Sequence, residues 1–140
     1  MQARNLDLSL DADPMPLPET LERFIALVER NAHIEAIEEF YTVDASMQEN
    51  QDAPRIGRNA HAANERRVLS KAKTLNSRCV PPVFVNGDNV VIRWIFQFEW
   101  LDGTATRMEE IAYQRWEGER IAEETFFYDP IQRVPRKAHA

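Results

Sequence analysis

The chain has 140 residues, of which 44% are hydrophobic and 29% charged, a composition typical of a globular protein with one hydrophobic core. Its formal net charge of −6 argues against a nucleic-acid partner, because phosphate contacts require a basic field. A single cysteine, Cys79, excludes a disulfide framework and a cysteine metal site.

The two ends of the chain differ in composition from the middle. Residues 1–17 combine prolines and aspartates with a few leucines, which predicts a mobile N-terminal arm. The stretch after Asp129 predicts a disordered tail over residues 131–140, so that residues 18–130 form a single domain. No segment resembles a signal peptide or a membrane span, and we therefore expect a cytoplasmic protein without a membrane partner.

Two amphipathic helices are predicted at the start of the domain. Pro18 suits the first turn of a helix, and the following apolar residues recur at the helical spacing i, i+3, i+4, i+7. These residues are Leu21, Phe24, Ile25 and Val28. Asn31 is expected to cap a second, shorter helix that ends near Phe40.

A strand, a loop and a third helix are predicted next. Residues 41–49 alternate weakly, with Val43, Ala45 and Met47 expected to point inward. Residues 51–58 contain proline and glycine and are predicted to be a loop. A long helix is predicted from about residue 59 to residue 75. Its inward stripe is expected to be His61, Glu65, Val68, Ala72 and Leu75.

The remainder predicts a meander of strands. Residues 90–100 alternate without a break in β-branched and aromatic residues, which is the strongest strand signal in the chain. A strand over residues 78–85 precedes them, and the Asn86-Gly87 pair predicts the hairpin between the two. Two further strands are expected over residues 108–116 and 121–128.

Three groups of residues have the order and spacing of one known fold. The groups are Arg23–Val28 with Ile34–Ile37 and Phe40-Tyr41; Ala45–Glu49 with Gly57-Arg58; and Arg115–Gly118 with Ile121 and Glu123-Glu124. Together they resemble the nuclear transport factor 2-like families, above all the SnoaL-like polyketide cyclases and the ketosteroid isomerases, over Leu21 to Tyr128. The resemblance implies an α+β, cone-shaped (cystatin-like) fold with three N-terminal helices packed on a curved, mainly antiparallel sheet.

The resemblance also assigns positions to the residues of the isomerases. Their proton-shuttling carboxylate falls on Glu49, and a tyrosine at a helix end is kept as Tyr41. Their two oxyanion donors fall on Phe24 and Ala112, which have no polar hydrogen to give. Because such donors usually make the largest contribution to stabilising the transition state, this pattern argues against steroid isomerisation by that mechanism.

The resemblance further suggests which strand residues face the cone. If Trp94 and Phe96 point inward, neighbouring strands place carboxylates there too; a shift of one residue would exchange Glu110 for Glu109 and Glu124 for Glu123. The side chains expected to line the cavity are Phe24, Tyr41, Met47, Glu65, Trp94, Phe96, Phe98, Glu110, Ala112, Glu124 and Tyr128. Carboxylates in an aromatic cavity are expected to have raised pKa values, which suits acid–base chemistry.

The catalytic hypothesis centres on Glu49 as general base, with His61 as its partner or as the acid, and with Tyr41 as a donor to Glu49. His61 and Glu65 have the spacing of two metal ligands but lack a third, so no metal is expected. The chain also lacks a phosphate-binding loop and a nucleophile elbow, and no cofactor is expected. His33 and His139 are interpreted as surface residues.

Three functional interpretations remain open. The first is an enzyme of the SnoaL type that binds a small apolar molecule and acts as a cofactor-free isomerase, cyclase or lyase. The second is a non-catalytic binding protein, and the third is a dimerisation module whose cone is filled. A homodimer through the outer face of the sheet is expected because that face is apolar. Its expected residues are Val91, Ile95, Ile111, Tyr113 and Phe127.

Overall fold

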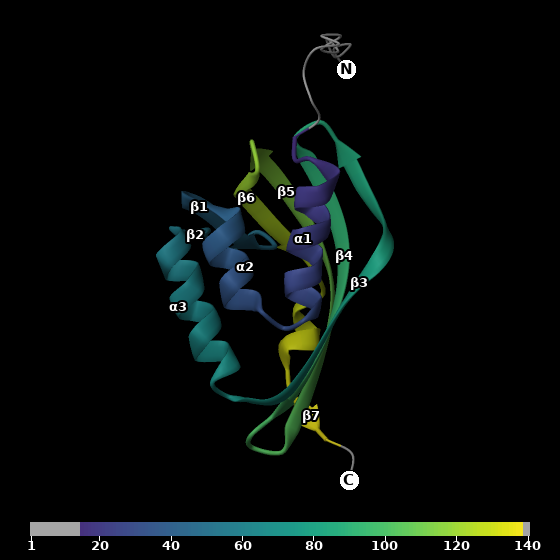
Figure 1. Cartoon of the computed structure of the whole chain (residues 1–140). Coiled ribbons are helices and arrows are strands. Elements are labelled where there is room, and N and C mark those ends of the chain that lie inside the picture. The colour runs from purple at the N-terminus through teal and green to yellow at the C-terminus, as the bar shows by residue number, and fades with distance from the viewer. Residues whose placement is uncertain (1–14, 139–140) are drawn as a thin grey trace.

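The computed structural model describes residues 15–138, so the arm predicted over residues 1–17 lies almost entirely outside the described part. Three helices lie on one face of a strongly curved sheet (Figure 1). The helices are α1 (Pro18–Glu29), α2 (His33–Phe40) and α3 (Arg58–Leu69). The strands are β1 (Tyr41–Glu49), β2 (Arg55–Ile56), β3 (Ala72–Asn86), β4 (Asn89–Trp100), β5 (Thr104–Glu117), β6 (Arg120–Phe127) and β7 (Arg136–Lys137), with a 3-10 helix η1 (Pro130–Arg133) before β7.

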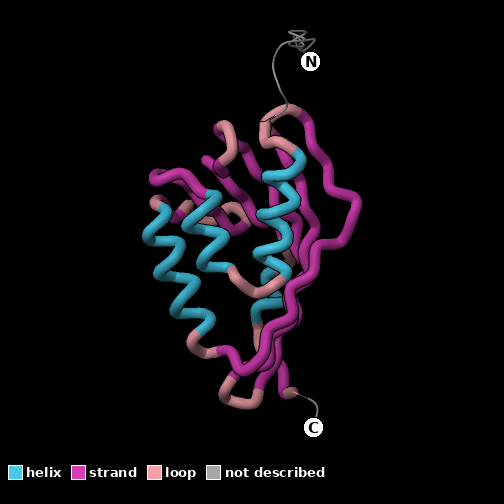
Figure 2. The backbone as a smooth tube through the Cα atoms, in the orientation of Figure 1, coloured by secondary structure: helices cyan, strands magenta, loops and turns pink. Residues whose placement is uncertain are grey.

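The strands, magenta in Figure 2, form one mainly antiparallel sheet. Their order is β2-β1-β6-β5-β4-β3, and β7 pairs with β5. Only the β1–β6 pair is parallel among the described strands. The predicted α+β fold, with three helices on a curved and mostly antiparallel sheet, is therefore confirmed. No helix within residues 15–138 is long and apolar enough to cross a membrane.

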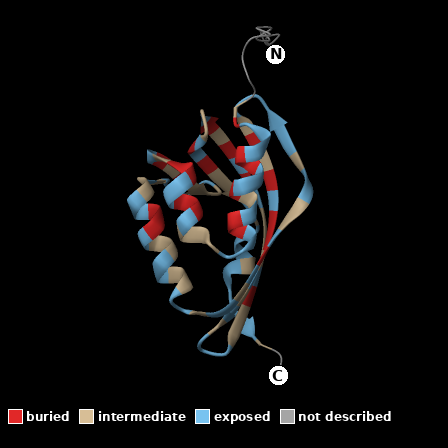
Figure 3. Cartoon of the chain, in the orientation of Figure 1, coloured by how far each residue is buried: buried red, intermediate tan, exposed pale blue. Residues whose placement is uncertain are grey.

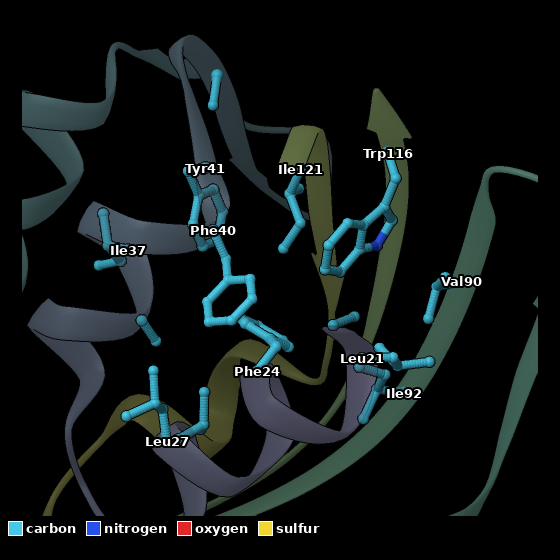
Figure 4. Close-up of a cluster of buried hydrophobic side chains, with 14 of the residues drawn as sticks. Leu21, Phe24, Leu27, Ile37, Phe40, Tyr41, Val90, Ile92, Trp116 and Ile121 are labelled. Atoms are coloured by element: carbon cyan, nitrogen blue, oxygen red, sulfur yellow. The ribbon is translucent and has the colours of Figure 1, made fainter. Parts of the chain in front are cut away.

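The core lies between the helices and strands β1, β4, β5 and β6, and buried positions gather there (Figure 3). Phe24 packs edge-on against Phe40 and Trp116, with ring centroids 5.6 Å and 5.9 Å apart. Figure 4 shows these rings in one cluster with Tyr41 and Ile121. Because this end of the cone is filled with aromatic side chains, any open space must lie toward its other end.

The third helix is shorter than the sequence predicts. The third helix ends at Leu69 rather than Leu75, and residues from Ala72 onward belong to β3. Pairing of Ala72 with Trp100 and of Leu75 with Phe98 on β4 prevails over the local helical spacing.

Asn31 does not cap α2, and the prediction that it does is wrong. It has φ +65° and ends α1: its N–H bonds the carbonyl of Val28, and the next N–H, of Ala32, bonds the carbonyl of Leu27. This is the left-handed helix ending that asparagine tolerates, and the residue before α2 is Ala32 instead.

Three further expectations fail. Val43 is 69% exposed because the ladder between β1 and β6 shifts after Tyr41, which breaks the alternation. The loop predicted over residues 51–58 contains β2. The tail predicted to be disordered forms η1 and β7 as far as residue 137, and the Gln132 side-chain amide bonds both the N–H and the carbonyl of Glu109 on β5.

The outer face of the sheet carries the expected apolar residues. Ile111, Tyr113 and Phe127 are 37%, 46% and 43% exposed and lie beside one another across β5 and β6. Val91 pairs with Tyr113, whereas Ile95 is buried. This face would remain in contact with water in a monomer.

Candidate functional site

A cavity of about 390 Å³ opens between the helices and the end of the sheet that carries the β4–β5 turn. Its aromatic walls are two stacked pairs, Trp94 with Phe96 and Phe98 with Trp100. Of the residues singled out from the sequence, those that line it are Phe24, Tyr41, Met47, Glu49, Glu65, Trp94, Phe96, Phe98, Glu110 and Glu124. Space of this size suits a small organic molecule.

The expected strand register is the one found in the structure. Trp94 pairs with Glu110, and Gln114 pairs with Glu124, so both glutamates belong to the inward face. Glu109 bonds Arg93 on the outer side of the sheet, and Glu123 bonds Arg115. Ala112 also faces inward but is completely buried in the core rather than part of the cavity wall.

Glu124 is the centre of a buried hydrogen-bond network. Its Oε1 accepts from the Tyr41 hydroxyl, and its Oε2 accepts from Gln114 Nε2 at 2.6 Å. Trp116 Nε1 in turn donates to Gln114 Oε1 at 2.9 Å, which fixes the orientation of the amide. Burial raises the pKa of Glu124 to about 7, against the lowering effect of the two hydrogen bonds. The Tyr41 hydroxyl is thus occupied by Glu124 and not by Glu49.

Glu110 differs from Glu124 in having no hydrogen-bond partner within residues 15–138. Burial, followed by the negative charges of Glu124, Glu49 and Glu65, raises the pKa of Glu110 to about 8. The carboxyl is therefore mostly protonated at neutral pH and presents an O–H group to an aromatic-walled space. A neutral acid in such a place can donate a hydrogen bond or a proton to a ligand oxygen.

Glu49 lies at the rim of the cavity with 39% of its side chain exposed. The hydroxyl of Tyr128 donates to Glu49 Oε1 at 2.5 Å, and the Arg133 guanidinium is 4.0 Å from the same oxygen. Tyr128 is not among the residues that line the cavity. Its burial and the bond to Glu49 raise its pKa.

His61 does not contact Glu49, and the predicted pair between the two is wrong. His61 is 1% exposed; its Nε2 donates to the carbonyl of Ala45 at 2.7 Å, and its Nδ1 accepts from Arg55 Nε at 3.0 Å. Burial first, and then the charge of Arg55, lower its pKa. His61 is thus a neutral imidazole that ties α3 to β1, outside the cavity wall.

His33, interpreted from the sequence as a surface residue, lies in the cavity wall with 11% of its side chain exposed. It contacts Glu65 Oε1 at 3.2 Å and Ser77 Oγ at 2.9 Å. The sequence contains one indication of this inward position: His33 lies four residues before the buried Ile37, and this spacing places both residues on one face of a helix. His139 lies outside the described residues. Within residues 15–138, no three His, Cys, Asp or Glu side chains are placed to hold a metal ion.

Three helices over one curved, mainly antiparallel sheet form the cone-shaped fold of the nuclear transport factor 2-like proteins. The family model of the SnoaL-like domain matches residues 21–124, and the chain therefore belongs to this family. No curated protein matches the sequence.

Several solved structures share the fold at low identity. A protein with a ketosteroid isomerase-like fold from Catenulispora acidiphila, in complex with trimethylamine, has a TM-score of 0.68 and 16% identity over 82% of this chain and 88% of its own. A Mesorhizobium loti protein assigned provisionally as a SnoaL-like polyketide cyclase has a TM-score of 0.68 and 20% identity over 81% and 100%. An LEH-like epoxide hydrolase from M. tuberculosis has a TM-score of 0.67 and 11% identity over 81% and 83%. These likenesses show the fold alone.

Proposed function

We propose that this protein binds a small, mainly apolar carbonyl compound in its cone and carries out acid–base chemistry on it without a cofactor. The observation that supports the proposal is the placement of Glu110, whose carboxyl lines an aromatic-walled cavity and has no hydrogen-bond partner within residues 15–138. Burial there raises its pKa to about 8. Because this carboxyl lines the cavity and has no partner among the described residues, it is available to donate a hydrogen bond to a ligand oxygen.

Glu110 supplies the donor that the resemblance to the isomerases leaves missing. It lies two residues before Ala112 on the same face of β5, and its protonated carboxyl donates to the carbonyl oxygen as negative charge develops there. Glu49 is the proposed base: it takes the proton from the carbon next to the carbonyl, the electron pair forms the enol double bond, and the oxygen receives the proton of Glu110. Return of the protons at the same or another carbon gives exchange or isomerisation.

Hydrogen exchange tests this function without knowledge of the natural substrate. α-Tetralone is incubated with the protein in deuterated water, and loss of the proton signal next to the carbonyl is followed by NMR. Glu110→Gln should lower the exchange rate by about two to four powers of ten, since the acid is lost and the shape kept. Glu35→Gln, an exposed position on α2, is the matched control and should behave as the wild type. Equal rates in Glu110→Gln and wild type would contradict the proposal.

The second candidate is a non-catalytic binding protein, and the aromatic walls favour it to the same degree as they favour an enzyme. The complex of the Catenulispora acidiphila protein with trimethylamine is an example of small-molecule binding in this fold. Tight binding of α-tetralone without protein-dependent exchange would support this candidate. The open cavity beside Trp94 and Trp100 counts against the third interpretation, a filled cone.

A further inference from the structure

A chain of hydrogen-bonded side chains lies along the helix side of the cavity and takes no part in the proposed proton transfer. His33 begins α2, and its ring packs edge-on against Phe96 with centroids 5.5 Å apart. Its Nε2 lies 2.9 Å from Ser77 Oγ on β3, and its Nδ1 lies 3.2 Å from Glu65 Oε1 on α3. The side chains of His33 and Glu65 are 11% and 23% exposed, and both line the cavity.

The direction of each hydrogen bond follows from Asn31. Its Nδ2 donates to the carbonyl of Leu75 at 2.9 Å, because the reverse orientation of the amide would place two oxygens at that distance. Asn31 Oδ1 therefore accepts from the Ser77 hydroxyl at 2.8 Å. This bond uses the only proton of Ser77, whose oxygen can then only accept from His33. His33 Nε2 must carry a hydrogen.

The contact between His33 Nδ1 and Glu65 Oε1 then determines whether the other oxygen of Glu65 donates or accepts hydrogen bonds. Two acceptors would repel each other at 3.2 Å, so one proton lies between them. If His33 holds the proton, Glu65 is a carboxylate; if Oε1 holds it, Oε2 is the carbonyl oxygen of an acid. In both cases Oε2 only accepts hydrogen bonds, and in both the pair has no net charge.

We propose that Glu65 Oε2 is an acceptor-only subsite of the cavity and binds a hydroxyl group of the ligand. No donor within residues 15–138 is hydrogen-bonded to this oxygen, although Glu65 lines the cavity. A neutral hydroxyl suits a pair without net charge, whereas an ammonium would require a negative partner.

The inference rests on the proposed function and narrows its ligand class to a small hydroxyketone. Glu110 lies on the sheet and Glu65 on the helix layer, so the cavity offers a donor on one wall and an acceptor on the other. The carbonyl oxygen accepts from Glu110 while the hydroxyl donates to Glu65. His33 acts as a positioning residue, because it holds Glu65 Oε1 and leaves Oε2 toward the ligand.

Matched tetralones test the subsite by calorimetric titration at pH 7. The set comprises α-tetralone, its ring-hydroxylated isomers and their methyl ethers, which accept hydrogen bonds but cannot donate them. At least one hydroxytetralone should bind the wild type about tenfold more tightly than its ether and than α-tetralone. Glu65→Leu should remove this preference, and the control Glu35→Leu, at an exposed position on α2, should keep it.

The Glu65→Gln variant shows whether the ligand hydroxyl needs a hydrogen-bond acceptor or a negative charge at position 65. The glutamine amide can donate to His33 Nδ1 and keep its carbonyl oxygen toward the cavity, so this variant should retain the hydroxyl preference. Loss of the preference in a Glu65→Gln protein with native circular dichroism would overturn the assignment. Nitrogen-15 NMR of His33 in the wild type is independent of any variant: an imidazole without a proton on Nε2 would overturn it even if Glu65→Leu does not fold.

The outcomes separate this inference from the proposed function. Equal affinities across the tetralones, or a preference that survives in Glu65→Leu, would overturn the subsite alone, because binding in the cavity would still be established. Failure of every tetralone to bind at millimolar concentration would overturn the proposed function and the subsite together.

Discussion

Replacement of Glu110 by glutamine should make the stability of this protein less dependent on pH. Burial and neighbouring carboxylates raise the pKa of Glu110 from 4.5 to about 8 in the folded state, whereas the unfolded chain keeps an ordinary value. Between these values the folded state holds a proton that the unfolded state has released, so the free energy of unfolding falls as pH rises. The contribution of protonated Glu110 to the free energy of unfolding is fully present below about pH 4.5 and is lost as pH rises through about 8.

The size of the effect follows from the shift. At ~1.36 kcal/mol per pKa unit, ionisation of Glu110 lowers the free energy of unfolding by ~4 kcal/mol between about pH 5 and pH 9. Glu110→Gln has no such penalty, and its stability relative to the wild type should rise by roughly that amount over the range. Glu124, whose pKa is also raised, is present in both proteins and largely cancels in the comparison.

Urea unfolding at constant ionic strength, followed by tryptophan fluorescence at about pH 5, 7 and 9, measures this difference. Glu35→Gln is again the matched control and should follow the wild type at each pH. A stability difference between Glu110→Gln and wild type that stays constant to within ~0.5 kcal/mol would show that Glu110 is not a buried neutral acid.

Three further results are expected. Tyr41→Phe should lower the free energy of unfolding by ~1–3 kcal/mol in urea titrations and raise the pKa of Glu124 further, seen by carbon-13 NMR, because the buried carboxylate loses a hydrogen bond. Glu49→Gln should keep α-tetralone binding and slow hydrogen exchange by about two to four powers of ten, and an unchanged rate would remove Glu49 as the base. Light scattering should give about twice the monomer mass of 16.3 kDa, and Tyr113→Lys with Phe127→Lys should return the monomer; a monomeric wild type at micromolar concentration would contradict the homodimer.

The register of the sheet could be predicted because alternation in residues 90–100 is unbroken. Trp94 and Phe96 share one face, and a tight hairpin, in which Asn86 pairs with Asn89, connects their strand to the preceding one. Once Trp94 points inward, antiparallel pairing places Glu110 opposite it and leaves Glu109 outside. The acidic character of the cavity follows from this one strand and its neighbours.

The histidines could not be placed in the same way, because their partners are remote in the chain. His33 meets Ser77 across 44 residues, and His61 meets Ala45 across 16. A local pattern shows only that both histidines lie near helix starts. The prediction of where the third helix ends is wrong for a related reason. The pairing of Leu75 with Phe98 joins residues that are distant in the chain, and it outweighs the local helical spacing of the sequence.

The four glutamates that line the cavity have the same type of side chain but lie in four different environments. Glu124 has both oxygens bonded by neutral donors, Glu65 has one oxygen held by His33, and Glu49 meets a hydroxyl and a guanidinium at the rim. Among these four, only Glu110 has no hydrogen-bond partner within residues 15–138. Its pKa is raised to about 8, whereas that of Glu124 is raised to about 7. Because a carboxyl without a partner favours its neutral form, Glu110 is the group from which a ligand can draw a proton, while its neighbours offer acceptors. An arrangement that separates donor from acceptors in one apolar space selects ligands that carry complementary oxygen groups.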